Sequence, residues 1–262
     1  MKGALDYVAP MNVTFDRYVL SALCLSPLLL LVRGKIPRDR ATLLRIVVSG
    51  IATAAGSVST YVGLVYAASG VAAILTYTQP LFVFLLSALF LRAEAKIDRL
   101  FGAFVGFSGV AVLSIQKSSS LGMFAHSEFL LLIGALMWGV TVVYYKKALS
   151  HVDPILTNAF QQTSGIVLLA ALAGGLEGFR FSLAAPYVLM ILYSAIFATC
   201  VGITLWYFLV REEDVTVLSS SSYLVPMIAI FLGWLVLGES VELGSILGMG
   251  LILAGIYLVN RS

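Results

Sequence analysis

Polar and aromatic side chains near the middle of long apolar segments are the residues of this chain that could act on a ligand. Amides and hydroxyls can hydrogen-bond the ends of a small neutral or zwitterionic compound, and aromatic rings can contact its body. The pattern therefore predicts a non-covalent ligand-binding site. Its candidate residues are Tyr61, Tyr77, Gln79, Trp138, Asn158, Gln161, Gln162, Trp206, Tyr207 and Tyr223.

The same residue types also have an ordinary structural use in membrane helices. Ser, Thr, Asn and Gln form hydrogen bonds between helices, and Trp and Tyr gather at membrane interfaces. Asn158 lies three residues before Gln161 and four before Gln162, so the three amides share one helix face. We expect the ligand-binding role for the residues nearest the middle of their segments, which are Tyr61, Tyr77, Gln161, Gln162, Trp206 and Tyr223.

The sequence carries no pattern typical of catalysis. An enzyme acting within the membrane needs a nucleophile and a base at depth. Both histidines, His126 and His151, fall between the apolar segments, and no Gly-x-Ser-x-Gly motif is present. Cys24 and Cys200 lie inside apolar runs, where packed thiols are expected rather than a disulfide or a metal site. We therefore expect no enzymatic activity, no metal and no cofactor.

Composition assigns the chain to the membrane proteins. It has 262 residues, of which 60% are hydrophobic and 11% charged, and its mean hydropathy is +1.02. A soluble domain carries about 25% charged residues. A bilayer core requires about 20 apolar helical residues. The sequence predicts an all-α polytopic protein in contact with lipid, with no nucleic-acid partner and nine spans at 14–33, 43–66, 70–91, 100–116, 129–147, 155–174, 187–210, 215–237 and 243–260.

The positive charges favour one orientation of these spans. With the segment 33–45 in the cytoplasm and the spans alternating, 12 of the 16 Lys and Arg residues lie inside. The four outside are Lys2, Arg17, Lys117 and Arg180. The positive-inside rule then predicts a cytoplasmic C-terminus, in a multi-pass protein of the inner (plasma) membrane.

Charged residues at membrane depth are few. Asp16 and Arg17 lie at the outer end of the first expected span, and the middles of the spans hold no Asp, Glu, Lys, Arg or His. Three roles are open for Arg17. It could pair with Asp16, extend to the outer head groups, or attract the carboxylate of a ligand.

An internal repeat organises the chain. The segment 69–94 matches 215–240 at a shift of 146, which places Tyr77 on Tyr223 and Pro80 on Pro226. We predict a first repeat over 1–116 and a second over 128–262. A proline lacks an N–H and clashes with the preceding turn, so Pro80 and Pro226 are candidate paired hinges, or else ordinary membrane prolines.

The two predicted repeats differ at their starts. Residues 2–10 match 146–154 at a shift of 144, and in the second repeat this segment is the tail of a helix. We therefore expect five helices in a complete repeat and the absence of the first helix from the first repeat; the alternative is a protein of nine helices. An odd number of helices makes the two repeats run in opposite directions, as an inverted repeat does.

These features together resemble the drug/metabolite transporter superfamily, EamA-type. The matching residues are Phe15 to Tyr18, Gly70 with Tyr77 to Pro80, Leu91 to Glu94, Trp138-Gly139 before Lys147, Leu237 to Ser240, and Gly248 to Gly255. The resemblance implies ten helices in two inverted five-helix bundles that export or exchange small metabolites, often amino acids. The members that the chain most resembles are the aromatic amino acid exporters.

The resemblance leads to an expected function. We expect a secondary transporter, an exporter or facilitator of amino acids or similar neutral or zwitterionic compounds, that works by alternating access. The lack of a mid-span acid favours a facilitator over a proton antiporter. The alternatives are a flippase, a sugar- or phosphate-metabolite carrier of the same superfamily, or an inactive truncated membrane protein. Two Gly-x-x-x-Gly patterns, at Gly102–Gly106 and Gly244–Gly248, suit a monomer or a homodimer.

Overall fold

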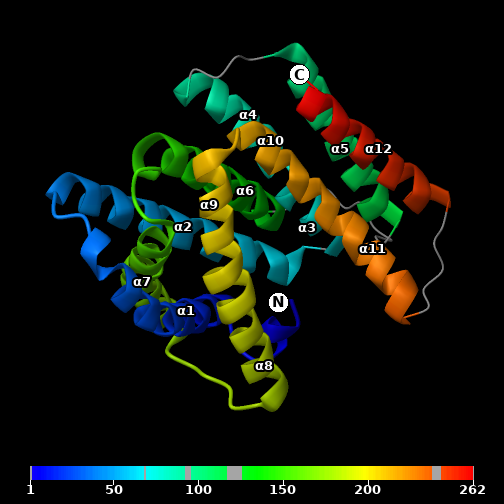
Figure 1. Cartoon of the computed structure of the whole chain (residues 1–262). Coiled ribbons are helices and arrows are strands. Elements are labelled where there is room, and N and C mark those ends of the chain that lie inside the picture. The colour runs from blue at the N-terminus through cyan, green and yellow to red at the C-terminus, as the bar shows by residue number, and fades with distance from the viewer. Residues whose placement is uncertain (1, 68, 92–95, 117–125, 238–242, 262) are drawn as a thin grey trace. The chain divides into compact units, whose positions relative to one another are not determined.

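A computed structural model describes residues 2–67, 69–91, 96–116, 126–237 and 243–261 (Figure 1). Every regular element in these ranges is a helix, which confirms the predicted all-α class. The chain forms two compact units. Unit 1 comprises Met1–Val65 with Tyr144–Glu212, and unit 2 comprises Tyr66–Val143 with Glu213–Ser262. The motif residues Glu94 and Glu239 lie outside the described residues.

The helices follow one another along the chain with short connections. Those of unit 1 are η1 (Lys2–Asp6), α1 (Pro10–Val32), η2 (Arg33–Lys35), α2 (Arg40–Tyr66), η3 (Tyr145–Leu149), α7 (Pro154–Leu172), η4 (Ala173–Glu177), α8 (Ala185–Tyr193), η5 (Ser194–Ile203) and α9 (Thr204–Glu212). Those of unit 2 are α3 (Ser69–Thr76), α4 (Gln79–Phe90), α5 (Ile97–Gln116), α6 (His126–Tyr144), α10 (Val215–Ser220), η6 (Ser221–Tyr223), α11 (Leu224–Leu237) and α12 (Leu243–Arg261).

Within the described ranges, eight helical stretches are long and apolar enough to cross a membrane. They coincide with eight of the nine predicted spans. The ninth predicted span, 100–116, is helical in the structure as α5. The chain is therefore a polytopic membrane protein.

Helix α1 begins at Pro10, four residues before the start that hydropathy predicts. Its first turn is capped by a residue far along the chain. The carboxylate of Glu177 accepts hydrogen bonds from the N–H groups of Met11 and Asn12, each at 3.1 Å. Because these N–H groups have no partner within the helix, the distant acid stabilises the earlier start.

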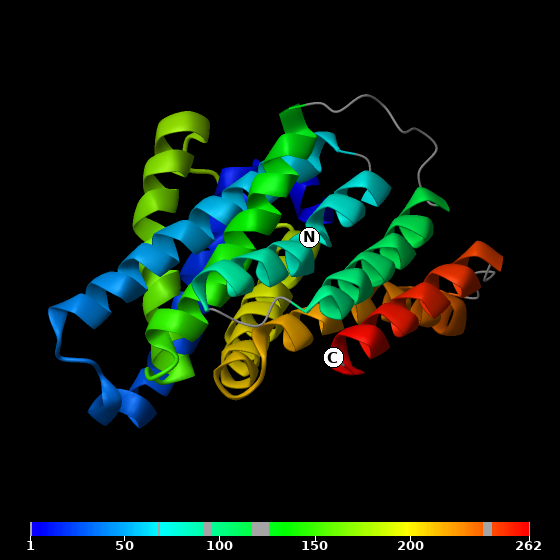
Figure 2. The ribbon, with the colours of Figure 1, turned by 90° about the horizontal axis from the view of Figure 1, so that it is seen from above.

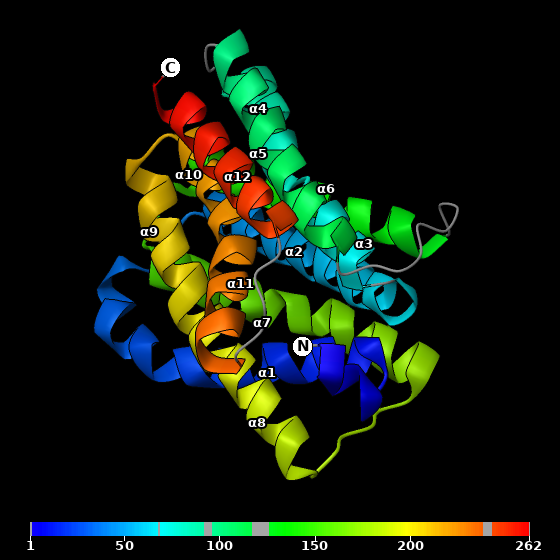
Figure 3. The same cartoon turned by 90° about the vertical axis from the view of Figure 1, so that its right-hand side faces the viewer.

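Helices α1 and α7 pack side by side in unit 1 and run antiparallel (Figure 3). The start of α1 contacts the end of η4 through Asn12 and Glu177. Its other end meets the start of α7 through a 2.8 Å ion pair between Lys35 and Asp153. Between these ends the helices approach closely, because Gly165 leaves room for the ring of Tyr18.

The span from α8 to α9 contains ten residues of π-helix, η5, in its middle. Such wide turns are rare and are frequent at functional sites. The carbonyl of Thr199 in this segment accepts a hydrogen bond from a side chain of α7 rather than serving its own helix alone. Nearby, Cys200 is buried and Cys24 half-buried, and both thiols are free.

Unit 2 is built around the antiparallel pair α5 and α12, which lie side by side in Figures 1 and 2. Glycines line the contact on both helices. A Cβ on Gly109 would lie 2.6 Å from the carbonyl oxygen of Gly248, and one on Gly255 would lie 2.7 Å from that of Gly102. Small residues of this kind allow membrane helices to touch along their backbones.

Both predicted prolines follow an interruption of their helix. The span that contains Pro80 is broken between α3 and α4, and the span that contains Pro226 changes to a 3-10 turn at η6. A proline cannot donate to the carbonyl four residues earlier, which leaves Thr76 and Ser222 without that bond. The predicted distortions are present, and movement about them stays a proposal.

The two predicted repeats do not coincide with the two units, because each unit takes helices from both halves of the sequence. The pairs α1 with α7 and α5 with α12 join matching helices of the two halves. Their antiparallel packing is the relation that an inverted repeat requires. The layout with a missing first helix stays a prediction.

The glycine contact predicts a difference between two alanine substitutions on α12. In Gly255→Ala the new methyl group would collide with the backbone of Gly102 and Gly106, so we expect a loss of about 1–3 kcal/mol of stability. Gly250→Ala is the matched control, because nothing lies within 4 Å of its Cβ position. Thermal unfolding in detergent measures both, and equal melting temperatures would contradict the packing.

A second prediction concerns the Arg99–Asp214 ion pair of unit 2, at 2.8 Å. Burial alone would raise the pKa of the Asp214 carboxyl, but Arg99 and the N–H groups of Val217 and Thr216 lower it below its ordinary 3.8. A carboxyl with a lowered pKa stabilises the fold above its ordinary value, and this stabilisation is lost as the pH falls through the lowered value.

The variant Asp214→Asn keeps a helix cap but loses the charge. We expect wild type to unfold at a higher temperature than Asp214→Asn above pH 3.8, by an amount worth about 1 kcal/mol or less because the pair is partly exposed. The two melting curves should converge below that pH. A difference that persists at the lowest pH would show that the ion pair is not its source.

Candidate functional site

The ten predicted ligand-binding residues divide between the two units. Unit 2 holds Tyr77, Gln79, Trp138 and Tyr223. Unit 1 holds Tyr61, Asn158, Gln161, Gln162, Trp206 and Tyr207. The larger group includes a connected set of buried hydrogen bonds, so unit 1 contains the stronger candidate site.

Asn158 of α7 joins two segments of the α8–α9 span. Its amide nitrogen donates to the carbonyl of Thr199 and to the hydroxyl of Thr204, each at 2.9 Å. Its amide oxygen accepts from Gln162 at 3.1 Å. Asn158 has no exposed surface, so in this conformation its amide holds helices together.

Gln161 connects a different pair of helices. Its amide nitrogen donates to the hydroxyl of Ser49 on α2 at 2.7 Å, and its amide oxygen accepts from the hydroxyl of Tyr207 on α9 at 2.7 Å. The Tyr207 ring stacks on Tyr145, with centroids 4.2 Å apart. Gln161 thus lies between α2 and α9 with both ends of its amide bonded.

Of the interhelical partners of these amides, Tyr207 was among the predicted residues, and Ser49, Thr199 and Thr204 were not. On α2, Ser49 belongs to a polar stripe at every fourth residue, formed with Thr53, Ser57 and Tyr61. Residues four apart lie on one helix face, so this spacing could have identified Ser49 and Ser57. No comparable spacing singles out Thr199 or Thr204, which the π-helical segment brings to α7.

A second polar group surrounds Arg17 of α1. Its guanidinium donates to the hydroxyl of Ser57 at 3.2 Å and lies 5.3 Å from the ring centroids of both Tyr18 and Tyr61. The hydroxyl of Tyr18 also bonds to Ser57, at 3.0 Å. The predicted residue Tyr61 is 5% exposed and therefore contacts Arg17 rather than open space.

The neighbouring acid, Asp16, has a different partner. Its carboxylate accepts a hydrogen bond from the hydroxyl of Tyr187 on α8. Because α1 begins at Pro10 and not at residue 14, Asp16 lies deeper in the membrane-spanning stretch than the predicted outer end. It is an acid that the predicted boundary placed nearer the surface.

Some buried polar atoms of unit 1 have no hydrogen-bond partner among the described residues. They are the amide oxygen of Gln162, the indole nitrogen of Trp206, the hydroxyls of Tyr145 and Thr199, and the Nε atom of Arg17. An unpaired buried polar group costs about 1–3 kcal/mol. Such atoms are the ones that a bound solute could satisfy.

The four predicted residues of unit 2 lie in a more apolar setting. Tyr223 is fully buried, its ring packs on Gly106 and its hydroxyl donates to the carbonyl of Ala103 at 3.2 Å. Tyr77 packs against the same cluster. Gln79 is 8% exposed with no partner for its amide nitrogen among the described residues, and Trp138 is half-buried.

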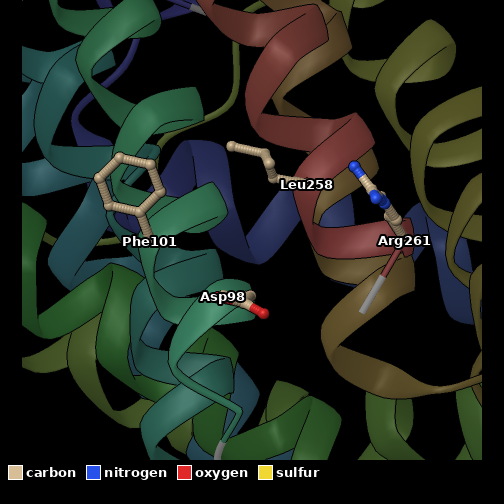
Figure 4. Close-up of a pocket in the computed structure, with 4 residues that line it drawn as sticks. All are labelled: Asp98, Phe101, Leu258 and Arg261. Carbon is tan, nitrogen blue, oxygen red and sulfur yellow. The ribbon is translucent and has the colours of Figure 1, made fainter.

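A pocket of about 380 Å³ lies where α5 begins and α12 ends (Figure 4). Asp98 and Phe101 line it from α5, and Leu258 and Arg261 line it from α12. None of the predicted ligand-binding residues belongs to it. The pocket is therefore not part of the candidate site.

Comparison with known proteins identifies the family. The model of the EamA-like transporter family matches residues 1–115 and 126–261. The chain belongs to this family. The predicted resemblance is confirmed.

Two similar proteins that are named as transporters or exporters match most of the chain. The uncharacterized transporter YoaV of Bacillus subtilis is 26% identical over 268 residues, which cover 98% of this chain and 89% of YoaV. A probable terminal-alkyne amino-acid exporter of Streptantibioticus cattleyicolor is 27% identical over 200 residues, covering 76% of this chain and 66% of the exporter. A crystal structure with a TM-score of 0.82 and 19% identity covers 99% of this chain and 90% of its own and shows that the fold is shared.

For this EamA-family chain, the two stacked tyrosines allow a matched test of the network. Tyr207→Phe removes the donor to Gln161 and leaves a buried amide oxygen unpaired, so we expect a loss of about 1–3 kcal/mol. Tyr145→Phe removes a hydroxyl that has no partner among the described residues, so stability should stay the same or rise. Thermal unfolding compares them, and a larger loss in Tyr145→Phe would contradict the assignment.

Proposed function

We propose that this chain is a secondary transporter, an exporter or facilitator, of amino acids or similar neutral or zwitterionic compounds and that it works by alternating access. The observation that supports this substrate class is the buried amide and hydroxyl network of unit 1, within a chain of a transporter family. Amides and hydroxyls can hydrogen-bond both ends of a zwitterion without carrying a net charge themselves.

The unpaired atoms support a path for a polar solute in unit 1. Gln162 and Trp206 each have a buried polar atom without a partner among the described residues, one an acceptor and the other a donor. A solute that carries both an ammonium and a carboxylate has a donor for the Gln162 oxygen and an acceptor for the Trp206 N–H. The alkyne amino-acid exporter, at 27% identity, adds support for this class of compound.

Alternating access requires elements with two arrangements. The interrupted spans at Pro80 and Pro226 are candidates, because short helical pieces joined at a break can pivot with few hydrogen bonds to change. The proposed role of both prolines is that of hinges.

Energy coupling is proposed to be absent, as in a facilitator or exchanger. Asp16 is the acid within the first span, and Tyr187 already donates to it. In the proposed orientation, Asp16 lies toward the outer end of the span and not in its middle. Were the transporter driven by protons, Asp16 is the group that would carry them.

The proposed orientation has a cytoplasmic C-terminus in the inner (plasma) membrane. Contacts within unit 1 support the alternation of the spans. Lys35 pairs with Asp153, and Lys146 donates to the carbonyl of Arg211, so residues assigned to the cytoplasmic side meet one another. Asn12 and Glu177, assigned to the outside, meet at the other ends of their helices.

Uptake into proteoliposomes tests the proposal, with a panel of radiolabelled neutral and aromatic amino acids. We expect saturable flux that is the same with and without a pH gradient. Gln161→Ala should reduce this flux at least about tenfold, because it removes the hydrogen bonds that join α7 to α2 and to α9. Arg45→Gln, which changes an exposed side chain on α2, is the control that should keep it.

Two results would change the proposal. Flux that requires the gradient and disappears in Asp16→Asn would show proton coupling through that acid. No flux for any member of the panel, in protein whose melting temperature shows that it is folded, would overturn the proposed substrate class.

A further inference from the structure

The charge of Arg17 has no acidic partner among the residues that the structure describes. Ion pairs in this part of the chain include Lys35 with Asp153, Arg99 with Asp214, and Arg211 with Glu212. Within the described residues, the guanidinium of Arg17 donates to the neutral hydroxyl of Ser57. A cation within a membrane span is costly and is commonly retained for function.

The adjacent acid does not neutralise it. Asp16 accepts from Tyr187 on α8, whereas the guanidinium of Arg17 contacts Ser57 and Tyr61 on α2. Successive residues of a helix point about 100° apart, so one helix presents the two charges to different neighbours. The positive charge is left for another anion.

The geometry does not suit an arginine that merely extends to the lipid head groups. Arg17 is seven residues after the start of α1, which is about 10 Å along the helix. Its guanidinium lies across the helix interface, 5.3 Å from the rings of Tyr18 and Tyr61, and its Nε atom is buried. Cation–π contact with two rings holds the group in this place.

The matching position in the second half of the sequence is occupied by a neutral amide. Arg17 is seven residues after Pro10, the first residue of α1, and Gln161 is seven after Pro154, the first of α7. Gln161 has both ends of its amide bonded between helices. Arg17 has five N–H donors and uses one of them within the described residues.

We propose that Arg17 binds the carboxylate of the transported solute. This inference rests on the proposed transport function and narrows its substrates to compounds with a carboxylate, amino acids among them. The planar guanidinium matches a carboxylate with two parallel hydrogen bonds. Ser57, Tyr18 and Tyr61 act as positioning residues that hold the guanidinium, and its partly exposed remainder meets the ligand.

The test compares ligands that differ in the carboxylate alone. L-Phenylalanine and L-leucine are measured beside their amides, first by the thermal stabilisation of purified protein and then by uptake into proteoliposomes. The variants are Arg17→Gln and Arg17→Lys. Arg45→Gln is the matched control, because Arg45 is an exposed cation on α2 of the same unit.

We expect wild type to bind the acids more tightly than the amides. Arg17→Gln should weaken binding of the acids about ten- to a hundredfold and should not weaken binding of the amides, because only the acids lose an oppositely charged partner. Arg17→Lys keeps the positive charge but cannot form the two parallel hydrogen bonds of a guanidinium. Its preference for acids over amides should therefore lie between those of wild type and Arg17→Gln. Arg45→Gln should behave as wild type.

Equal weakening of acids and amides, or no change in either, would overturn the inference. So would stabilisation of wild type by anionic lipid, lost in Arg17→Gln, without stabilisation by any acid, since Arg17 would then bind a head group. Acids that bind through Arg17 but are not taken up would overturn the transport proposal and leave the inference standing. Neither binding nor uptake of any acid would overturn both.

Discussion

The need to pair polar groups inside the protein governs this structure, because the hydrocarbon of a bilayer offers them no hydrogen bonds. The helices pair their backbone N–H and C=O groups by hydrogen bonds within each helix. Many polar side chains of unit 1 form hydrogen bonds with one another. Asn158 and Gln161 each bond to other spans from one helix, α7. Their amides are buried at a cost that only complete pairing offsets.

Glycine makes this pairing geometrically feasible in unit 1. Gly165 admits the ring of Tyr18 from α1, and Gly50 of α2 lies against Gln161. Were these positions larger, the helices would stand farther apart and the short side chains of Ser49 and Ser57 would not reach their partners. In unit 2 the glycines of α5 and α12 serve close packing itself, beside an apolar cluster around Tyr223. The two units are thus held by different means.

A few polar groups of unit 1 differ from these fully hydrogen-bonded ones. Arg17 is a cation among neutral partners, and Gln162 and Trp206 have buried atoms without partners in the described part of the chain. A transporter must bind its solute and release it, so it has reason to leave part of its polar surface unsatisfied when empty. In the proposed function, the fully bonded residues hold the helices together, and the residues with unpaired atoms are available to a ligand.

Sequence alone determined the class of the molecule. Hydropathy located the spans because length and apolarity are local properties, and the matching motifs identified the family. It also marked Pro80 and Pro226, since the loss of an N–H acts within one turn. It also singled out Asn158, Gln161 and Tyr207, which take part in buried hydrogen bonds in the structure and whose role in ligand binding stays a proposal.

Tertiary structure alone decided which residues meet. The start of α1 depends on Glu177, more than 160 residues away, so no local pattern could place it. The partners Ser49, Thr199 and Thr204 became visible only when α2 and the π-helical segment were packed on α7. The units themselves mix both halves of the sequence, because matching helices pack antiparallel. Contacts between distant segments depend on how the helices pack, and the periodicity of residues within one segment does not indicate which other segment packs against it.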